Sequence, residues 1–301
     1  MEPRRAFGTL LTVNSTNHPH IDRLAPSEEK FIGNRYVPTP NDPPWNSWVA
    51  LAVWAFSVLA IILIPSLLIL PYVLPLQGQF SGNNEFAAFL KSDPTAVLIQ
   101  ILGIIPAHIV TLLLAWFVVT RARRYSFRST LGWQSGGFAW WHYVVILGAF
   151  FAVAAVVGQF YPEQENDMLR MIRSSRYAVF AVAFMATFSA PLIEEVVYRG
   201  ILYSAFQRTL GVPAGVAVVT LLFALVHVPQ YYPSMSTIFL LTFLSLILTL
   251  VRVRAGSLLP CIILHTIFNG LQSLLLLLEP YIGPIAQQPE PTAAALFRLL
   301  N

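Results

Sequence analysis

Charged residues are scarce in this sequence of 301 residues: only 11% are Asp, Glu, Lys or Arg, while 56% are hydrophobic. Soluble globular domains average about 25% charged residues, so the composition excludes an ordinary water-soluble domain. It is typical of a chain that crosses a membrane several times, with lipid around most of its surface. We therefore expect an all-α fold, a polytopic bundle of transmembrane helices.

Cysteine is nearly absent as well, since Cys261 is the only one in the sequence. A single cysteine excludes an intramolecular disulfide and indicates nothing about the redox compartment. Proline precedes it at position 260 and apolar residues surround it, which favours an inert buried thiol over a reactive one. The pattern His-Glu-x-x-His is also missing, which excludes the usual helical zinc-protease arrangement.

Basic residues are in modest excess, giving a formal charge of +4 and an isoelectric point near 9.3. They stand beside apolar runs and form no patch interleaved with aromatic residues, so nucleic acid is not an expected partner. We expect membrane lipids as partners. The sequence does not indicate an oligomeric state.

Seven apolar runs approach or exceed the 17–25 residues that a membrane-spanning helix needs. The fourth and fifth are short, so we expect them to continue as helices, to about Phe206 and from Val212 to His227. An eighth element at Pro291–Asn301 is too short to span but suits an interface. The seven runs lie near Trp48–Leu70, Ala96–Val119, Trp140–Phe160, Tyr177–Ile193, Ala214–Val228, Ser236–Val251 and Leu258–Leu278.

The distribution of Lys and Arg between these runs predicts the orientation. With the N-terminus inside, inner segments hold thirteen and outer segments five, which favours a cytoplasmic N-terminus in the cell membrane. Residues 1–46, rich in proline, asparagine and charge, are then predicted to be a disordered cytoplasmic tail. We expect residues 47–279 to form the transmembrane domain and residues 280–301 to form a C-terminal tail with a short interfacial helix.

Two adjacent carboxylates and an arginine interrupt the fourth run, in the sequence Glu194-Glu195-Val-Val-Tyr-Arg199. A charged side chain at the bilayer centre costs about 2.5–3.5 kcal/mol on insertion scales, so such residues usually face a protein-lined cavity and carry function. Glu195 and Arg199 are i and i+4, the spacing of a helical ion pair. Glu194 points about 100° away and needs another partner.

Later runs contain two polar pairs at the same helical spacing: Phe223 with His227, and His265 with Asn269. A carboxylate hydrogen-bonded to an imidazole can activate water without a covalent intermediate. A second histidine with an amide can stabilise an oxyanion. These roles suit Glu194 with His227 as the base pair, and His265 with Asn269 as the oxyanion site.

Glu-Glu-x-x-x-Arg, Phe-x-x-x-His and His-x-x-x-Asn, in this order and each in an apolar helix, resemble the CPBP family of intramembrane proteases, also called the CAAX protease or Abi family. The resemblance covers about residues 177–278. It implies hydrolysis of a peptide bond within the membrane, in a peptide or lipidated protein substrate, with Glu194, His227, His265 and Asn269 catalytic and with Glu195, Arg199 and Phe223 supporting. The serine and aspartate motifs of other intramembrane proteases are missing.

Several alternatives remain open. Glu194, His227 and His265 offer three ligands for Zn²⁺ with a free fourth position, although the same residues suffice for a metal-free mechanism, which we prefer. The Glu194–Arg199 cluster can instead be a structural salt bridge, or a proton path in a transporter, scaffold or bacteriocin self-immunity protein. His108, alone in the second run, is expected to be structural.

Overall fold

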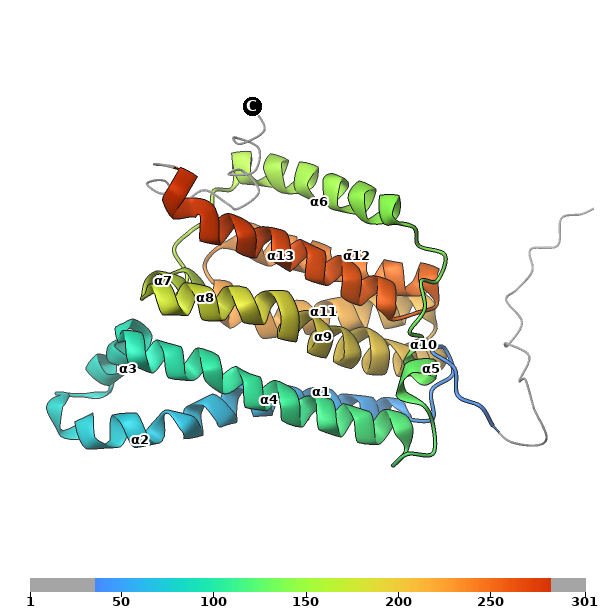
Figure 1. Cartoon of the computed structure of the whole chain (residues 1–301), viewed down its shortest axis with the longest axis horizontal. Helices are drawn as coiled ribbons and strands as arrows, with labels where there is room; N and C mark the ends of the chain where they lie inside the picture. Colours follow the sequence, from blue (N-terminus) through green and yellow to red (C-terminus); the bar gives the residue numbers. More distant parts are fainter. Residues whose placement is uncertain (1–35, 283–301) are drawn as a thin grey trace, which may run out of the picture. The chain divides into compact units, whose positions relative to one another are not determined.

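The structure is a computed structural model that describes residues 36–282, and its compact unit begins at Pro38. This part of the chain contains no β-strand, and seven of its helices are long and apolar enough to cross a membrane (Figure 1). The spanning segments are Ser47–Gln79, Pro94–Thr120, Trp140–Phe160, Arg176–Leu210, Val212–Tyr231, Met235–Ala255 and Leu259–Leu278. The predicted all-α multi-pass membrane bundle is therefore confirmed, and the fourth span does continue past the paired glutamates.

The helices follow the chain in simple order. They are α1 (Ser47–Leu68), α2 (Leu70–Val73), η1 (Leu74–Gln79), α3 (Asn83–Ser92), α4 (Pro94–Thr120), α5 (Phe127–Leu131), α6 (Trp140–Phe160), α7 (Asp167–Arg173), α8 (Arg176–Phe184), η2 (Met185–Ser189), α9 (Ala190–Glu195), η3 (Val196–Leu202), α10 (Tyr203–Leu210), α11 (Val212–Tyr231), α12 (Met235–Ala255) and α13 (Leu259–Ile282). The η2 and η3 segments are π-helical, so α8 to α10 form one continuous fourth span.

Local chemistry sets where the spans begin and end. Asn46 and Asp93 cap α1 and α4, each accepting a hydrogen bond from the backbone N–H three residues on, at 3.0 and 2.8 Å. Gly211 separates α10 from α11 and Gly256 follows α12, both at positive φ, which glycine adopts without steric cost. These helices therefore begin after side chains that cap them or end before glycines that adopt a positive φ.

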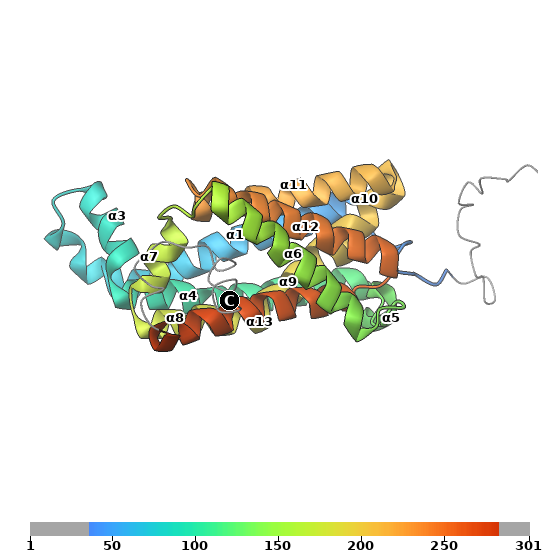
Figure 2. The ribbon, with the colours of Figure 1, turned by 90° about the horizontal axis from the view of Figure 1, so that it is seen from above.

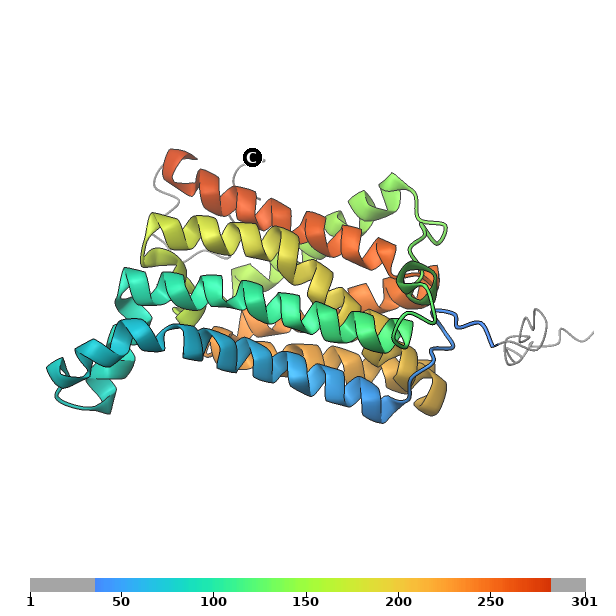
Figure 3. The same ribbon diagram turned by 60° about the horizontal axis from the view of Figure 1, so that its bottom comes forward.

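The fourth span lies at the centre of the bundle. α1 and α4 pack side by side against it, and α13 packs along α8, η2 and α9 (Figure 3). α11 and α12 pair with each other, while α6 crosses obliquely over α12 and α13 at the edge (Figure 2). The helix with the paired glutamates is therefore surrounded by α1, α4, α11, α12 and α13.

The segment before α1 is held against the bundle. The indole N–H of Trp45, a buried residue, donates to the carbonyl oxygen of Ile201 at 3.1 Å. Arg208 pairs with Asp42 at 3.0 Å, and Arg252 donates to the carbonyl oxygen of Pro40 at 2.6 Å. The tail predicted for residues 1–46 therefore includes a packed segment from residue 38 on. The indole of Trp45 and the carbonyl oxygen of Pro40 hydrogen-bond to groups of the bundle and hold this segment in place. The predicted C-terminal interfacial helix lies outside the described residues.

Candidate active site

Two π-helical segments flank α9, which carries both glutamates. A π turn has i→i−5 hydrogen bonds, and such turns are frequent at functional sites. In η2 the N–H of Ala190 donates to the carbonyl oxygen of Met185, five residues back. Residue 191 is a proline and has no N–H to continue this register. The carbonyl of Ala186 is thereby left for another donor.

Asn269 supplies that donor from α13, since its Nδ2 lies 2.8 Å from the carbonyl oxygen of Ala186. One turn further along, Ser273 bonds to Thr187 at 3.1 Å and to the carbonyl oxygen of Ala183 at 3.3 Å. α13 is therefore fixed to the π-helical segment by polar contacts. The expected oxyanion role of Asn269 stays a prediction, and the structure adds a positioning role for its amide.

Glu195 is completely buried and links the fourth span, through Arg199, to α13, through His265. Its Oε1 accepts hydrogen bonds from Arg199 Nη1 at 3.0 Å and from His265 Nδ1 at 2.8 Å. The helical pair predicted between Glu195 and Arg199 is present. The contact with His265, on a helix 70 residues away in sequence, could not be inferred from spacing.

Arg199 is fully buried, and its other N–H groups donate hydrogen bonds to residues of α12. Its Nη2 donates to the carbonyl oxygen and the hydroxyl of Ser245 at 2.9 and 2.8 Å, and its Nε donates to Thr249 Oγ1 at 3.3 Å. The guanidinium carbon lies 4.9 Å from the ring centroid of Phe223 on α11. This cation fastens the fourth span to α11 and α12, which fits the supporting role expected of Arg199 and Phe223.

His265 is buried and held in one orientation. A carboxylate can only accept, so Nδ1 carries the hydrogen shared with Glu195, and Nε2 of the neutral ring keeps a lone pair. Nε2 lies 3.8 Å from Glu194 Oε2, beyond hydrogen-bond distance. This carboxylate–imidazole arrangement fixes the tautomer and stabilises an imidazolium when one forms. His265 therefore presents a proton-accepting nitrogen beside Glu194.

Glu194 differs from its neighbour in having no hydrogen-bond partner within residues 36–282. Its side chain is 23% exposed, whereas that of Glu195 is 0% exposed. The Glu194 carboxylate also acts electrostatically on three further side chains, from α4, the fourth span itself and α11: His108, Tyr198 and Tyr231. It is thus an accessible carboxylate amid polar side chains of several helices.

His227 lies near the end of α11 and is partly buried. Its Nδ1 is 2.7 Å from the carbonyl oxygen of Phe223, an acceptor, so Nδ1 carries the hydrogen and Nε2 is left with a lone pair. The ring lies 4.5 Å from that of Phe223 and 6.4 Å from that of Tyr231. No hydrogen bond or ion pair in the described chain joins His227 to Glu194, so the expected direct pair is not formed.

His108, which is expected to be structural, also interacts electrostatically with Glu194. It is buried on α4, and its Nδ1 lies 3.2 Å from Ser189 Oγ in η2. The hydroxyl of Ser189 in turn donates to the carbonyl oxygen of Met185 at 3.4 Å. The only signal in the sequence was a histidine within an apolar run, which is too common to indicate a site on its own. Tyr198 and Tyr231 gave no signal, because aromatic residues are frequent in such runs.

The described residues do not gather a metal site. Among them, no group of three or more His, Cys, Asp or Glu side chains lies close enough together to hold a metal ion. His227 and His265 each direct Nδ1 to a protein acceptor and keep the lone pair of Nε2 free. The zinc alternative with Glu194, His227 and His265 stays a prediction, and no step below uses a metal.

No match to the chain was found among curated proteins or among solved structures. A family model does match, over residues 176–271. The matched segment runs from the start of α8 into α13 and includes all three motifs. The family is described as type II CAAX prenyl endopeptidase, Rce1-like, so the match confirms the resemblance predicted from the motifs and supports a peptidase role for this multi-pass membrane protein.

Proposed function

We propose that this protein is an intramembrane endopeptidase in which Glu194 activates the attacking water. The observation that carries this proposal is the contrast between two adjacent glutamates. Glu195 is buried and bonded to Arg199 and His265, whereas Glu194 is partly exposed and free of hydrogen bonds in the described chain. A carboxylate without a hydrogen-bond partner inside a membrane bundle costs free energy, so such a residue usually has a function. Activation of water for peptide cleavage is a function that requires a free carboxylate.

The reaction follows from these positions. Glu194 takes a proton from water, and the resulting hydroxide attacks the carbonyl carbon of the peptide bond. The tetrahedral intermediate then collapses as its C–N bond breaks, and the proton held by Glu194 passes to the departing amine. The products are a carboxylate and an amine, with no covalent enzyme intermediate.

The two histidines flank this proton path with different constraints. His265, oriented by Glu195, places Nε2 3.8 Å from Glu194 and can share the proton as it moves. His227 keeps Nε2 free, so a water molecule between it and Glu194 can be held by both. In this scheme the Glu194–His227 pair inferred from the motifs acts through a bridging water molecule. His265 interacts with Glu194 as well.

The family description suggests the substrate class, a prenylated protein cut near a C-terminal CAAX sequence. A lipid-modified C-terminus enters the bilayer by its own apolar chain, since each buried CH₂ contributes about 0.8 kcal/mol. The candidate site residues lie within the spanning segments, the part of the chain that a substrate anchored in the bilayer would meet.

The test uses the full-length protein in liposomes and a farnesylated peptide that ends in a CAAX sequence. We expect release of the terminal tripeptide, identified by mass, and none from protein carrying Glu194→Ala. The same peptide without the farnesyl group serves as the control and should be cut far more slowly. Release of the tripeptide at the parental rate by Glu194→Ala would refute the mechanism, and no cleavage of either peptide by the parent would refute the substrate class.

A further inference from the structure

Tyr198 has a buried hydroxyl whose hydrogen is uncommitted. The residue is 5% exposed, and the indole N–H of Trp54 on α1 donates to its oxygen at 3.1 Å. An indole nitrogen can only donate, so the tyrosine oxygen is the acceptor in this contact. Within residues 36–282 no acceptor is bonded to the phenol O–H. A buried donor without an acceptor is costly, which indicates a ligand or water as its partner.

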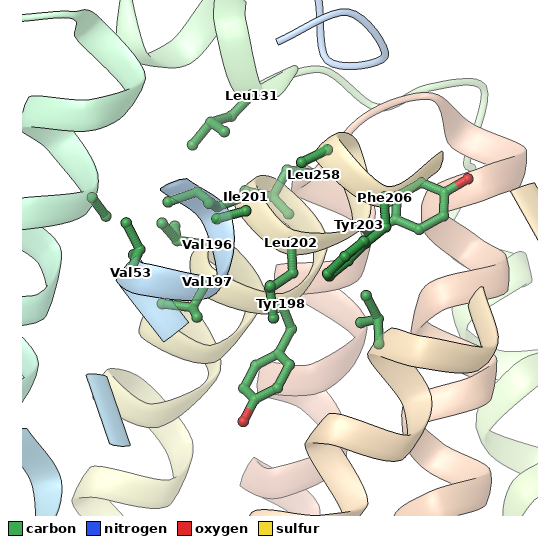
Figure 4. Packing of buried hydrophobic residues seen from close by; sticks show 14 of the residues in the cluster. Val53, Leu131, Val196, Val197, Tyr198, Ile201, Leu202, Tyr203, Phe206 and Leu258 are labelled. Atoms are coloured by element: carbon green, nitrogen blue, oxygen red, sulfur yellow. The ribbon is translucent and has the colours of Figure 1, made fainter. Parts of the chain in front are cut away.

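The hydroxyl of Tyr198 lies on the same side of the residue as the candidate active site. Most side chains around it belong to an apolar cluster, and Figure 4 shows the hydroxyl pointing away from Ile201 and Leu202. The ring packs edge-on against Phe223, with centroids 5.1 Å apart, and Phe223 in turn contacts His227. Glu194 precedes Tyr198 by one helical turn and acts on it electrostatically without a hydrogen bond. A partly exposed carboxylate and a hydroxyl donor therefore lie one helical turn apart on the same span.

Most of the other polar hydrogens of the site already have protein acceptors. Asn269 gives one of its two amide hydrogens to the carbonyl oxygen of Ala186, and Arg199 donates to Glu195 and to Ser245 on α12. The neutral rings of His227 and His265 each commit their hydrogen to a protein acceptor. Water attack on a peptide bond places negative charge on the carbonyl oxygen, and this charge needs a donor aimed at it.

We propose that Tyr198 is a further catalytic residue, whose phenol O–H hydrogen-bonds the carbonyl oxygen of the scissile peptide bond and stabilises the oxyanion. Trp54 is a positioning residue that occupies a lone pair of the phenol oxygen and so turns the hydrogen toward the substrate. This assignment rests on the proposed peptidase function and adds a donor to it. No proton is transferred from Tyr198, because the hydroxyl only donates a hydrogen bond.

Two variants separate this role from a structural one. Tyr198→Phe removes the phenol and its contact with Trp54, whereas Trp54→Phe removes the same contact but leaves the phenol in place. We expect Tyr198→Phe to lower kcat by about 10²–10³-fold, the loss typical of an oxyanion donor, with little change in KM. Trp54→Phe should lower kcat by much less, because the phenol donor stays in place and only its orientation is loosened. Equal losses in both variants, or an unchanged kcat for Tyr198→Phe, would overturn the proposal.

A second substitution serves if Tyr198→Phe reduces the yield of folded protein. Replacement of Tyr198 by 3-fluorotyrosine keeps the hydroxyl and makes it a stronger hydrogen-bond donor. The proposal expects a changed kcat, while a purely structural hydroxyl leaves kcat unchanged and thereby contradicts it. Glu194→Ala is assayed in parallel: activity lost there but kept in the Tyr198 variants refutes only the role of Tyr198, and activity kept in Glu194→Ala refutes the peptidase mechanism itself.

Discussion

Glu194 and Glu195 are adjacent in sequence, but their carboxylates meet different surroundings. Helical spacing predicted which of them pairs with Arg199, and the pair is present at 3.0 Å. Spacing could not show that Glu195 also orients His265, because that contact depends on how α13 packs against α9. The residue expected to be only structural thus also supports a candidate catalytic histidine.

Arg199→Met tests the structural part of this arrangement. It leaves a buried carboxylate without its cation, and breaking a buried pair from one side costs about 3–5 kcal/mol. We expect a clear drop in the thermal unfolding midpoint of the purified protein in detergent. The control is Arg173→Met, which removes an exposed pair with Glu165, with side chains 53% and 43% exposed.

Exposed pairs contribute about 0–1 kcal/mol, so the control should unfold near the parental temperature. Equal midpoints for Arg199→Met and Arg173→Met would show that the buried network does not hold the helices together.

At the scale of the elements, apolar length predicted the spans well. The first run was expected near residues 48–70 and the third at residues 140–160, and the structure has α1 at Ser47–Leu68 and α6 at Trp140–Phe160. The π-helical segments around α9 were not predictable, because the same residues are compatible with an ordinary α-helix. Their carbonyls are satisfied by distant groups, such as Asn269 and the indole of Trp45.

The link between Pro191 and Asn269 gives a prediction for these elements. Asn269→Ala leaves the carbonyl of Ala186 without its side-chain donor, which costs about 1–3 kcal/mol. Pro191→Ala restores a backbone N–H in the register that reaches this carbonyl. The loss caused by Asn269→Ala should therefore be smaller in the Pro191→Ala background, with a coupling of about 0.5 kcal/mol or more in a double-mutant cycle of unfolding free energies. Additive effects would mean that the asparagine does not replace the missing backbone donor.

For the whole molecule, composition and charge predicted a multi-pass helical membrane protein, and this is confirmed. The direction in which the chain enters the membrane is a separate prediction, based on thirteen inner and five outer basic residues. Spacing alone could not place residues 38–46 against the bundle, because their partners, among them Arg208 and Arg252, come more than 160 residues later.

Cysteine labelling in cells tests the orientation. In a Cys261→Ala background, Glu165→Cys lies in an exposed loop predicted to be outside and Arg124→Cys in an exposed loop predicted to be inside. A membrane-impermeant maleimide should label position 165 in intact cells and position 124 only after permeabilisation. The reverse pattern would contradict the predicted cytoplasmic N-terminus.

The most direct test of the whole account compares Glu194→Gln with Glu195→Gln in one preparation, by cleavage rate and by thermal unfolding. Loss of a general base typically costs 10²–10⁴-fold in rate, and Glu194 makes no hydrogen bond within the described residues, so Glu194→Gln should abolish most cleavage without lowering the unfolding midpoint. Glu195→Gln should lower the midpoint, since it weakens a buried pair. Cleavage at the parental rate by Glu194→Gln, with the protein folded, would contradict the account.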